Sequence, residues 1–174
     1  AVLVLDRMTC FMKRLLLQIC LAWTVSGCLS AAEPAEWKAA AAKAVITPTE
    51  PMYLAGFANR EVPAEGTAME LHAKSLAVED KQGARFVMVT LDLVEVTYQL
   101  RDAVAAAVKA KFGLPERALL LNCSHTHCGP ELKYTDLEFM GLTDPLRKER
   151  CLRYNAFLTE KIVSIVGEAL KALA

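Results

Sequence analysis

The sequence predicts an α/β fold: a mixed β-sheet with a βαβ unit and flanking helices. Three observations indicate this. Residues 86–91 and 118–121 are continuous apolar runs of strand length, and residues 98–112 between them repeat apolar side chains every four positions. Residues 146–172 carry a second, longer helical stripe. Because a strand, a crossover helix and a returning strand form a right-handed parallel unit, the two runs are expected to lie in one sheet.

The N-terminal part of the sheet is predicted to begin with a strand at about residues 42–47, after an alanine-rich spacer. Thr47 and Pro48 end this strand. An irregular stretch follows at 51–66. Loops of this length inside a compact domain are usually functional or disordered, and its aromatic and apolar content argues against disorder.

A β-hairpin follows this loop. Residues 71–79 alternate small or apolar side chains with longer ones, residues 80–83 have turn chemistry, and residues 86–91 favour a buried strand. The second strand is expected at the centre of the sheet, with Asp92 at its end. Asp92 is either a turn residue or part of a site, because ligands gather at the carboxyl ends of strands in α/β sheets.

Two helices are predicted, the first from its caps and periodicity and the second from its periodicity. Thr97 can cap a helix over residues 98–112, which Gly113 and then Pro115 end. The last helix, roughly 146–172, has a continuous apolar stripe.

The central feature is the stretch from 118 to 130. Its apolar half predicts a strand buried on both faces, and its polar half carries two histidines before Gly129 and Pro130. Residues i and i+2 of an extended segment point to the same side, so His125 and His127 are expected to face one cleft, about 7 Å apart along the backbone. Imidazoles held at a strand end suit a zinc site, which keeps one position open for water or substrate when it is catalytic.

Other interpretations of this stretch remain open. Two exposed histidines on a surface loop would have the same sequence. Cys123 and Cys128 flank the pair as candidate metal ligands, although Cys123 is better explained as a small buried residue. Ser124 lacks the Gly-x-Ser-x-Gly pattern of a serine hydrolase, and His72, alone within a predicted strand, is better explained as structural.

The N-terminal region, residues 1–32, is predicted to be upstream sequence plus a secretory signal peptide beginning at about Met12. A charged start and the short apolar core at 15–27 favour export over a membrane anchor. Cleavage could follow the small residues before 33, or Cys28 could become a lipidated first residue. The predicted mature domain is 33–174, and we expect a periplasmic or secreted location.

Composition narrows the functional class. The chain has 20 basic and 20 acidic residues, and loss of three basic residues and one acidic residue with the leader would leave a net charge of −2. This balance does not favour nucleic acid as a partner. Three cysteines remain in the mature part, Cys123, Cys128 and Cys151, an odd number that does not describe a disulfide scaffold, although one bridge is possible.

Five stretches in series resemble the N-terminal part of the catalytic domain of the neutral/alkaline non-lysosomal ceramidase family. They lie at residues 42–48, 54–60, 72–77, 89–94 and 122–130. The resemblance implies a zinc-dependent amide hydrolase that splits ceramide into sphingosine and a fatty acid at a membrane surface. It implies that His125 ligates zinc and that His127 lies beside the scissile amide as a catalytic residue. It assigns no certain role to Gly56 or Arg60.

The chain also departs from the family pattern. The family takes a further histidine, a glutamate and a tyrosine as zinc ligands from downstream, together with a catalytic serine, and no histidine follows His127. We therefore expect an incomplete catalytic domain that is inactive alone.

Two other functions are compatible with the sequence. One is a different hydrolase class built on the His-x-His pair, which would need a later histidine. The other is a non-catalytic exported envelope protein, possibly a lipoprotein, that binds a metal or a partner. The sequence does not predict the oligomeric state or the acyl-chain preference.

Overall fold

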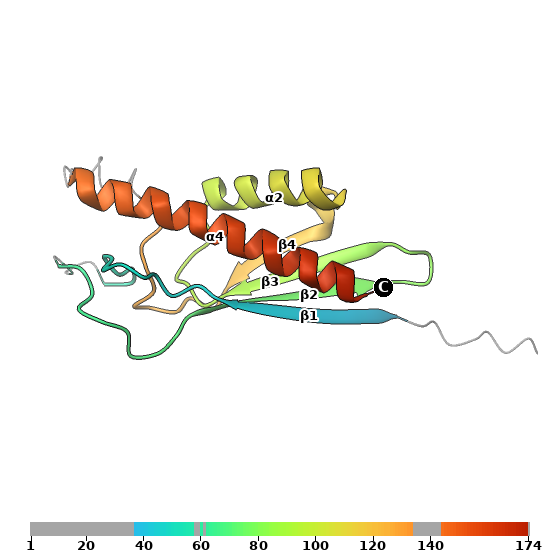
Figure 1. Ribbon diagram of the computed structural model, residues 1–174, viewed down its shortest axis with the longest axis horizontal. Coiled ribbons are helices and arrows are strands. Elements are labelled where there is room, and N and C mark those ends of the chain that lie inside the picture. The colour runs from blue at the N-terminus through green and yellow to red at the C-terminus, as the bar shows by residue number, and fades with distance from the viewer. Residues whose placement is uncertain (1–36, 58–59, 61, 134–143, 174) are drawn as a thin grey trace, which may run out of the picture. The chain divides into compact units, whose positions relative to one another are not determined.

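A computed structural model describes residues 37–57, 60, 62–133 and 144–173 of the chain. It contains one four-stranded sheet, two long helices and a short 3₁₀ turn (Figure 1). The elements are β1 (Lys38–Val45), β2 (His72–Glu79), β3 (Arg85–Leu91), α2 (Tyr98–Phe112), the 3₁₀ turn (Glu116–Ala118), β4 (Leu119–Cys123) and α4 (Pro145–Ala172). The predicted α/β class is confirmed.

The sheet has the order β1-β2-β3-β4 and is mixed, as predicted. The first three strands pair antiparallel, whereas β3 and β4 pair parallel through α2. The predicted βαβ unit is thus present, with β3 inside the sheet. The hairpin between β2 and β3 closes on Asp80, whose carboxylate accepts hydrogen bonds from the N–H groups of Gln82 and Ala84.

Both long helices are capped, α2 by the residues that the sequence indicates and α4 by a residue that it did not single out. The Thr97 hydroxyl accepts a hydrogen bond from the N–H of Leu100, and Gly113 ends α2 with a left-handed φ of 68°. In α4, Pro145 occupies the first turn and the Asp144 side chain accepts a hydrogen bond from the N–H of Leu146 at 2.9 Å.

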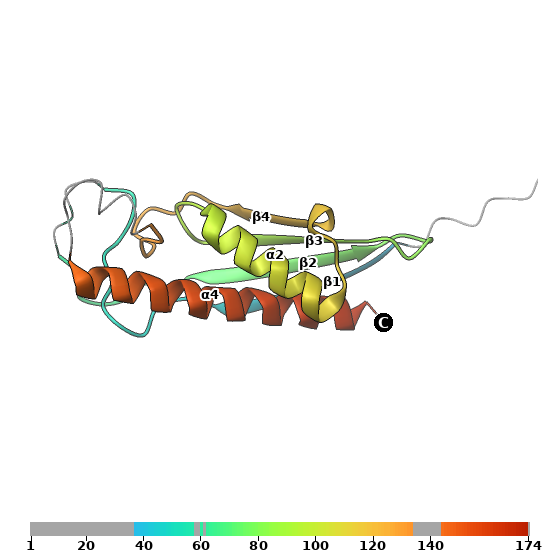
Figure 2. The ribbon, with the colours of Figure 1, turned by 90° about the horizontal axis from the view of Figure 1, so that it is seen from above.

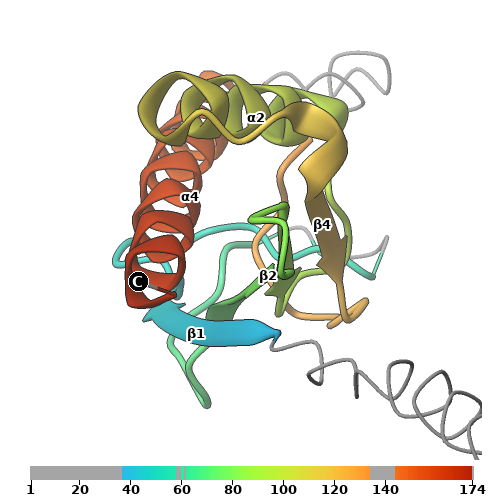
Figure 3. The same cartoon turned by 90° about the vertical axis from the view of Figure 1, so that its right-hand side faces the viewer.

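The helices α2 and α4 lie on the same face of the sheet (Figures 2 and 3). The buried face of β3 carries Val87, Val89 and Leu91, and α4 buries a long stripe against the sheet. The stripe comprises Tyr154, Leu158, Ile162, Ile165, Val166, Ala169 and Leu170, as predicted. At the site end of the sheet, the buried Tyr154 hydroxyl donates to the carbonyl oxygen of Ile46 at 2.6 Å.

Two sequence-based expectations about the strands are wrong. The first strand begins at Lys38, not near residue 42, because residues 38–41 pair with β2 despite their alanines, and Lys38 forms an ion pair with Glu79 at 3.4 Å. Tertiary pairing here overrides the low β propensity of alanine. The strand β4 is not buried on both faces, since Leu120 is 43% exposed on the face away from the helices.

Several predictions fall outside the described residues: the signal peptide, the lipidation of Cys28 and most of the loop from 131 to 145. Among the residues that the structure does describe, no helix is long and apolar enough to cross a membrane.

Candidate functional site

The two histidines of the central stretch meet, although not by the geometry that the sequence predicts. β4 ends at Cys123, and His125 and Cys128 have positive φ angles of 56° and 71°. The segment is therefore a turn, and the expected i, i+2 alternation of a strand is wrong here. The turn nevertheless brings Nε2 of His125 within 3.3 Å of Nε2 of His127.

The backbone after β3 holds the first histidine in place. Nδ1 of His125 lies 2.9 Å from the carbonyl oxygen of Val94. A carbonyl only accepts hydrogen bonds, so Nδ1 is the donor, and in the neutral imidazole Nε2 then keeps its lone pair. The N–H of Ser124 and that of Thr126 donate to the carbonyls of Leu91 and Leu93, which fixes the turn beside the end of β3.

The second histidine packs against the loop before β2. A Cβ on Gly56 would lie 2.6 Å from Cγ of His127, so only glycine fits there. Phe57 meets the same imidazole edge to face, with ring centroids 5.1 Å apart. Arg60 stacks over Phe57 and donates to Sγ of Cys128 at 3.0 Å.

A cleft of about 510 Å³ opens beside His127. Its volume falls within the range typical of small-molecule sites. Most of its lining comes from residues 47–71, which precede β2, and the rest comes from residues 126–130. The apolar part of the lining includes Met52, Leu54, Met69, Leu71 and Pro130.

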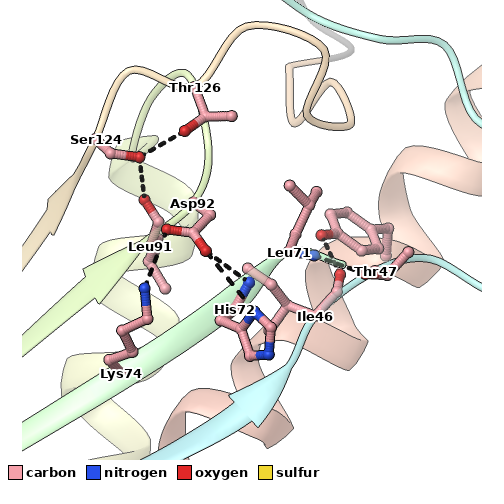
Figure 4. Close-up of polar contacts among 10 residues, drawn as sticks. Ile46, Thr47, Leu71, His72, Lys74, Leu91, Asp92, Ser124 and Thr126 are labelled. Atoms are coloured by element: carbon pink, nitrogen blue, oxygen red, sulfur yellow. Dashed lines mark hydrogen bonds and ion pairs between the residues drawn. The ribbon is translucent and has the colours of Figure 1, made fainter. Parts of the chain in front are cut away.

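Asp92 has a structural role in the described contacts. Its carboxylate accepts a hydrogen bond from the backbone N–H of His72 at 2.9 Å and lies 3.6 Å from Nζ of Lys74 (Figure 4). The His72 ring lies 4.0 Å from the same carboxylate. These contacts tie the end of β3 to β2, so the structural interpretation of both residues is the better one.

The remaining candidates of the central stretch are also placed. Ser124 shares a hydrogen bond with Thr126 and lies 3.3 Å from the carbonyl oxygen of Leu91, which its hydroxyl faces. Cys123 is half-buried and faces Val94, and Cys128 is exposed. Cys123, Cys128 and Cys151 are all free thiols.

Comparisons with known proteins identify the family of the chain. The model of the neutral/alkaline non-lysosomal ceramidase family, N-terminal domain, matches residues 40–148. The chain belongs to this family. No curated protein matches the chain.

Two solved ceramidase structures share the fold. The neutral ceramidase from Pseudomonas aeruginosa superposes with a TM-score of 0.65 at 23% identity, over 80% of this chain and 22% of that one. A structure described as ceramidase complexed with C2 gives 0.64 at 23% identity, over 79% and 21%. This ceramidase-family chain thus spans about a fifth of the length of these relatives.

The histidine pair fits part of the metal site that the family suggests. With Nδ1 bound to the Val94 carbonyl, Nε2 of a neutral His125 imidazole directs its lone pair toward the second imidazole, and neutral imidazole is a good ligand for divalent zinc. Within the described ranges, however, no group of three or more His, Cys, Asp or Glu side chains is arranged to hold a metal ion.

Sequence reasoning missed two parts of this ceramidase-family site. It expected a cleft faced by the two histidines but did not assign most of the lining to residues 47–71, although the apolar character of residues 51–66 was a signal for it. It also missed the ion pair between Glu131 and Arg147, which joins the end of the central stretch to α4. No local pattern marks that pair, because its partners are 16 positions apart.

Proposed function

We propose that this chain carries part of the active site of an amide hydrolase that cleaves the N-acyl bond of ceramide, releasing sphingosine and a fatty acid. The observation that carries the proposal is the convergence of Nε2 of His125 and Nε2 of His127 at 3.3 Å, beside an apolar cleft. Membership of the ceramidase family supports the same reaction class.

In this proposal His125 is the zinc ligand. Its Nδ1–H is bound to the Val94 carbonyl at 2.9 Å, which fixes the ring and the tautomer before any metal arrives. Zinc, when bound, polarises a carbonyl and lowers the pKa of a bound water.

His127 is the catalytic residue that binds and polarises the amide. Its Nε2 lies within contact distance of any group held at Nε2 of His125. Packing by Gly56 and Phe57 restricts the ring to one orientation, which lowers the entropic cost of aligning it with the scissile bond.

The cleft beside His127 is suited to an aliphatic chain of a lipid. Methionine and leucine side chains line it, and Arg60 and Glu65 add polar groups that could orient a headgroup. Flexible methionines adapt to chains of different shape. We assign the substrate class on this basis, with the lipid presented at a membrane surface.

We further propose that these 174 residues do not suffice for turnover. One histidine ligand cannot hold a catalytic zinc tightly, and no histidine follows His127 in the sequence. The missing ligands would come from polypeptide that this chain does not contain.

Export is proposed as well. The charged start at Met12 and the apolar core after it support a signal peptide. Metabolic labelling with palmitate tests lipidation: signal lost in Cys28→Ser indicates a lipoprotein, whereas label that persists, or is absent from both proteins, excludes Cys28 as the anchor.

The function is tested by hydrolysis of a fluorescent N-acyl sphingosine by the complete gene product. His125→Ala should abolish both zinc content and hydrolysis, while His127→Ala should keep the zinc and lose hydrolysis. Undiminished hydrolysis in His125→Ala would remove this residue from the metal site and contradict the proposal.

A further inference from the structure

A short antiparallel ladder joins the loop before β2 to the end of the central stretch. The N–H of Ala55 donates to the carbonyl of Gly129, and the N–H of Cys128 donates to that of Ala55. Two positions further along, the N–H of Glu131 donates to the carbonyl of Tyr53 at 3.0 Å. An isolated two-stranded ladder of this length has little stability of its own.

One end of the ladder is held by α4. The Arg147 guanidinium donates two hydrogen bonds of 2.5 Å to the Glu131 carboxylate and lies 4.0 Å from the centroid of the Tyr53 ring. Arg147 therefore contacts the terminal residue of both ladder segments. One helical turn later, Sγ of Cys151 lies 3.5 Å from the carbonyl oxygen of Glu131.

This contact is shielded from solvent. The side chains of Glu131 and Arg147 are only 11% and 14% exposed. The ion pair that Arg153 of α4 forms with Glu50 is more exposed, at 46% and 37%. A bidentate guanidinium-carboxylate pair with little exposure fixes both partners in angle as well as distance.

The other end of the ladder leads directly to the histidine site. Gly56 and Phe57 follow Ala55, and His127 precedes Cys128, so the ladder sets where the two loops meet. The span from the Tyr53–Glu131 pair to that contact is about 10 Å at the rise of an extended chain. Because this span is short, a displacement of the backbone at the Tyr53–Glu131 pair should also displace the backbone at the histidine contact.

We propose that Glu131 and Arg147 are positioning residues for His127: by clamping the ladder they hold Gly56 and Phe57 against the imidazole, so that its Nε2 faces His125. This role rests on the proposed function of His127 for its catalytic meaning, but the structural effect is independent of catalysis.

The test uses the full chain and nuclear Overhauser effects between the ring protons of His127 and Phe57, assigned with single histidine variants. Single substitutions would leave one buried charge unpaired and could unfold the protein. The principal variant therefore replaces both partners, Glu131→Leu with Arg147→Met, which removes the clamp without leaving a charge. The matched control is Arg153→Met, which breaks an ion pair of α4 that does not touch the ladder.

We expect the double variant to keep its far-UV circular dichroism and lose the His127–Phe57 effect, while the control retains it. Hydrolysis by the complete gene product carrying the double substitution should fall mainly in kcat. If the folded double variant keeps the effect at its original intensity, the positioning role is wrong. If the effect is lost but the unsubstituted complete product hydrolyses no N-acyl sphingosine, the clamp stands and the proposed function fails.

Discussion

The α-carbon of Gly56 packs against the imidazole of His127, so closely that a Cβ there would lie 2.6 Å from Cγ and 2.7 Å from Nδ1. The two residues are 71 positions apart in the sequence, and the ladder between residues 53–55 and 128–131 brings them together. The orientation of the second histidine therefore depends on the loop before β2 as much as on the turn that carries it.

Gly56→Ala should displace the His127 ring. The residue has φ of +98°, so a side chain adds backbone strain to the clash. We expect hydrolysis by the complete gene product to fall on the order of 10²-fold, the loss typical of a misplacement near 1 Å. Gly83→Ala is the matched control, because Gly83 also has positive φ but has nothing within 4 Å of the added Cβ. Equal activity losses in both variants would contradict this account.

Tyr154→Phe should destabilise the fold without touching the site. The buried Tyr154 hydroxyl donates to the Ile46 carbonyl at 2.6 Å, and its loss leaves that oxygen without this donor. We expect the free energy of unfolding to fall by about 1–3 kcal/mol in urea melts. Tyr98→Phe is the control, because Tyr98 is 86% exposed. A stability equal to that of the wild type would show that the hydrogen bond contributes nothing.

Cys151 should make the protein less stable in alkali. Burial, with the nearby Glu131 carboxylate, raises the pKa of this thiol from 9.0 to about 12. The folded state then holds a proton that the unfolded state releases, so stability is full below pH 9 and declines as the pH rises from 9 toward 12. The slope should approach about 1.4 kcal/mol per pH unit from this group.

Urea melts between pH 8 and 10.5 measure that slope. In Cys151→Ala the free energy of unfolding should fall less steeply with pH, by up to the slope that one bound proton contributes. Part of the decline that remains should come from Tyr154, because burial also raises the pKa of its hydroxyl. Superimposable slopes for the two proteins would show that the thiol does not contribute.

Alkylation should distinguish the exposed from the buried thiol. Cys128 is exposed and Cys151 is 0% exposed. Iodoacetamide should modify Cys128 first and reach Cys151 only when urea unfolds the chain, as read by peptide mass spectrometry. Early modification of Cys151 in the native protein would contradict the packing of α4 against Glu131.

Local signals predicted much of the fold. Thr97 and Gly113 bound α2 as the sequence indicated, because capping depends on side chains within a few positions. The start of β1 was missed because its alanines carry no strand signal and depend on pairing with β2. The exposed face of β4 was missed because its apolar sequence does not reveal whether helices cover one face of the sheet or both.

The candidate site was predictable only in part. The His-x-His motif located the histidines at a strand end. The contact between their rings, however, depends on a left-handed φ at His125, and a histidine at that position does not predict such a φ. Contacts such as Gly56 with His127, or Glu131 with Arg147, join residues distant in sequence and leave no periodic pattern.

The central claim is that His125 and His127 face one cation. Zinc added to the metal-free complete gene product, followed through the ring resonances of His72, His125 and His127, tests it most directly. We predict that the signals of His125 and His127 shift together and saturate while those of His72, which lies against Asp92, stay in place. Signals of the pair that do not move, or a shift confined to His72, would contradict the account.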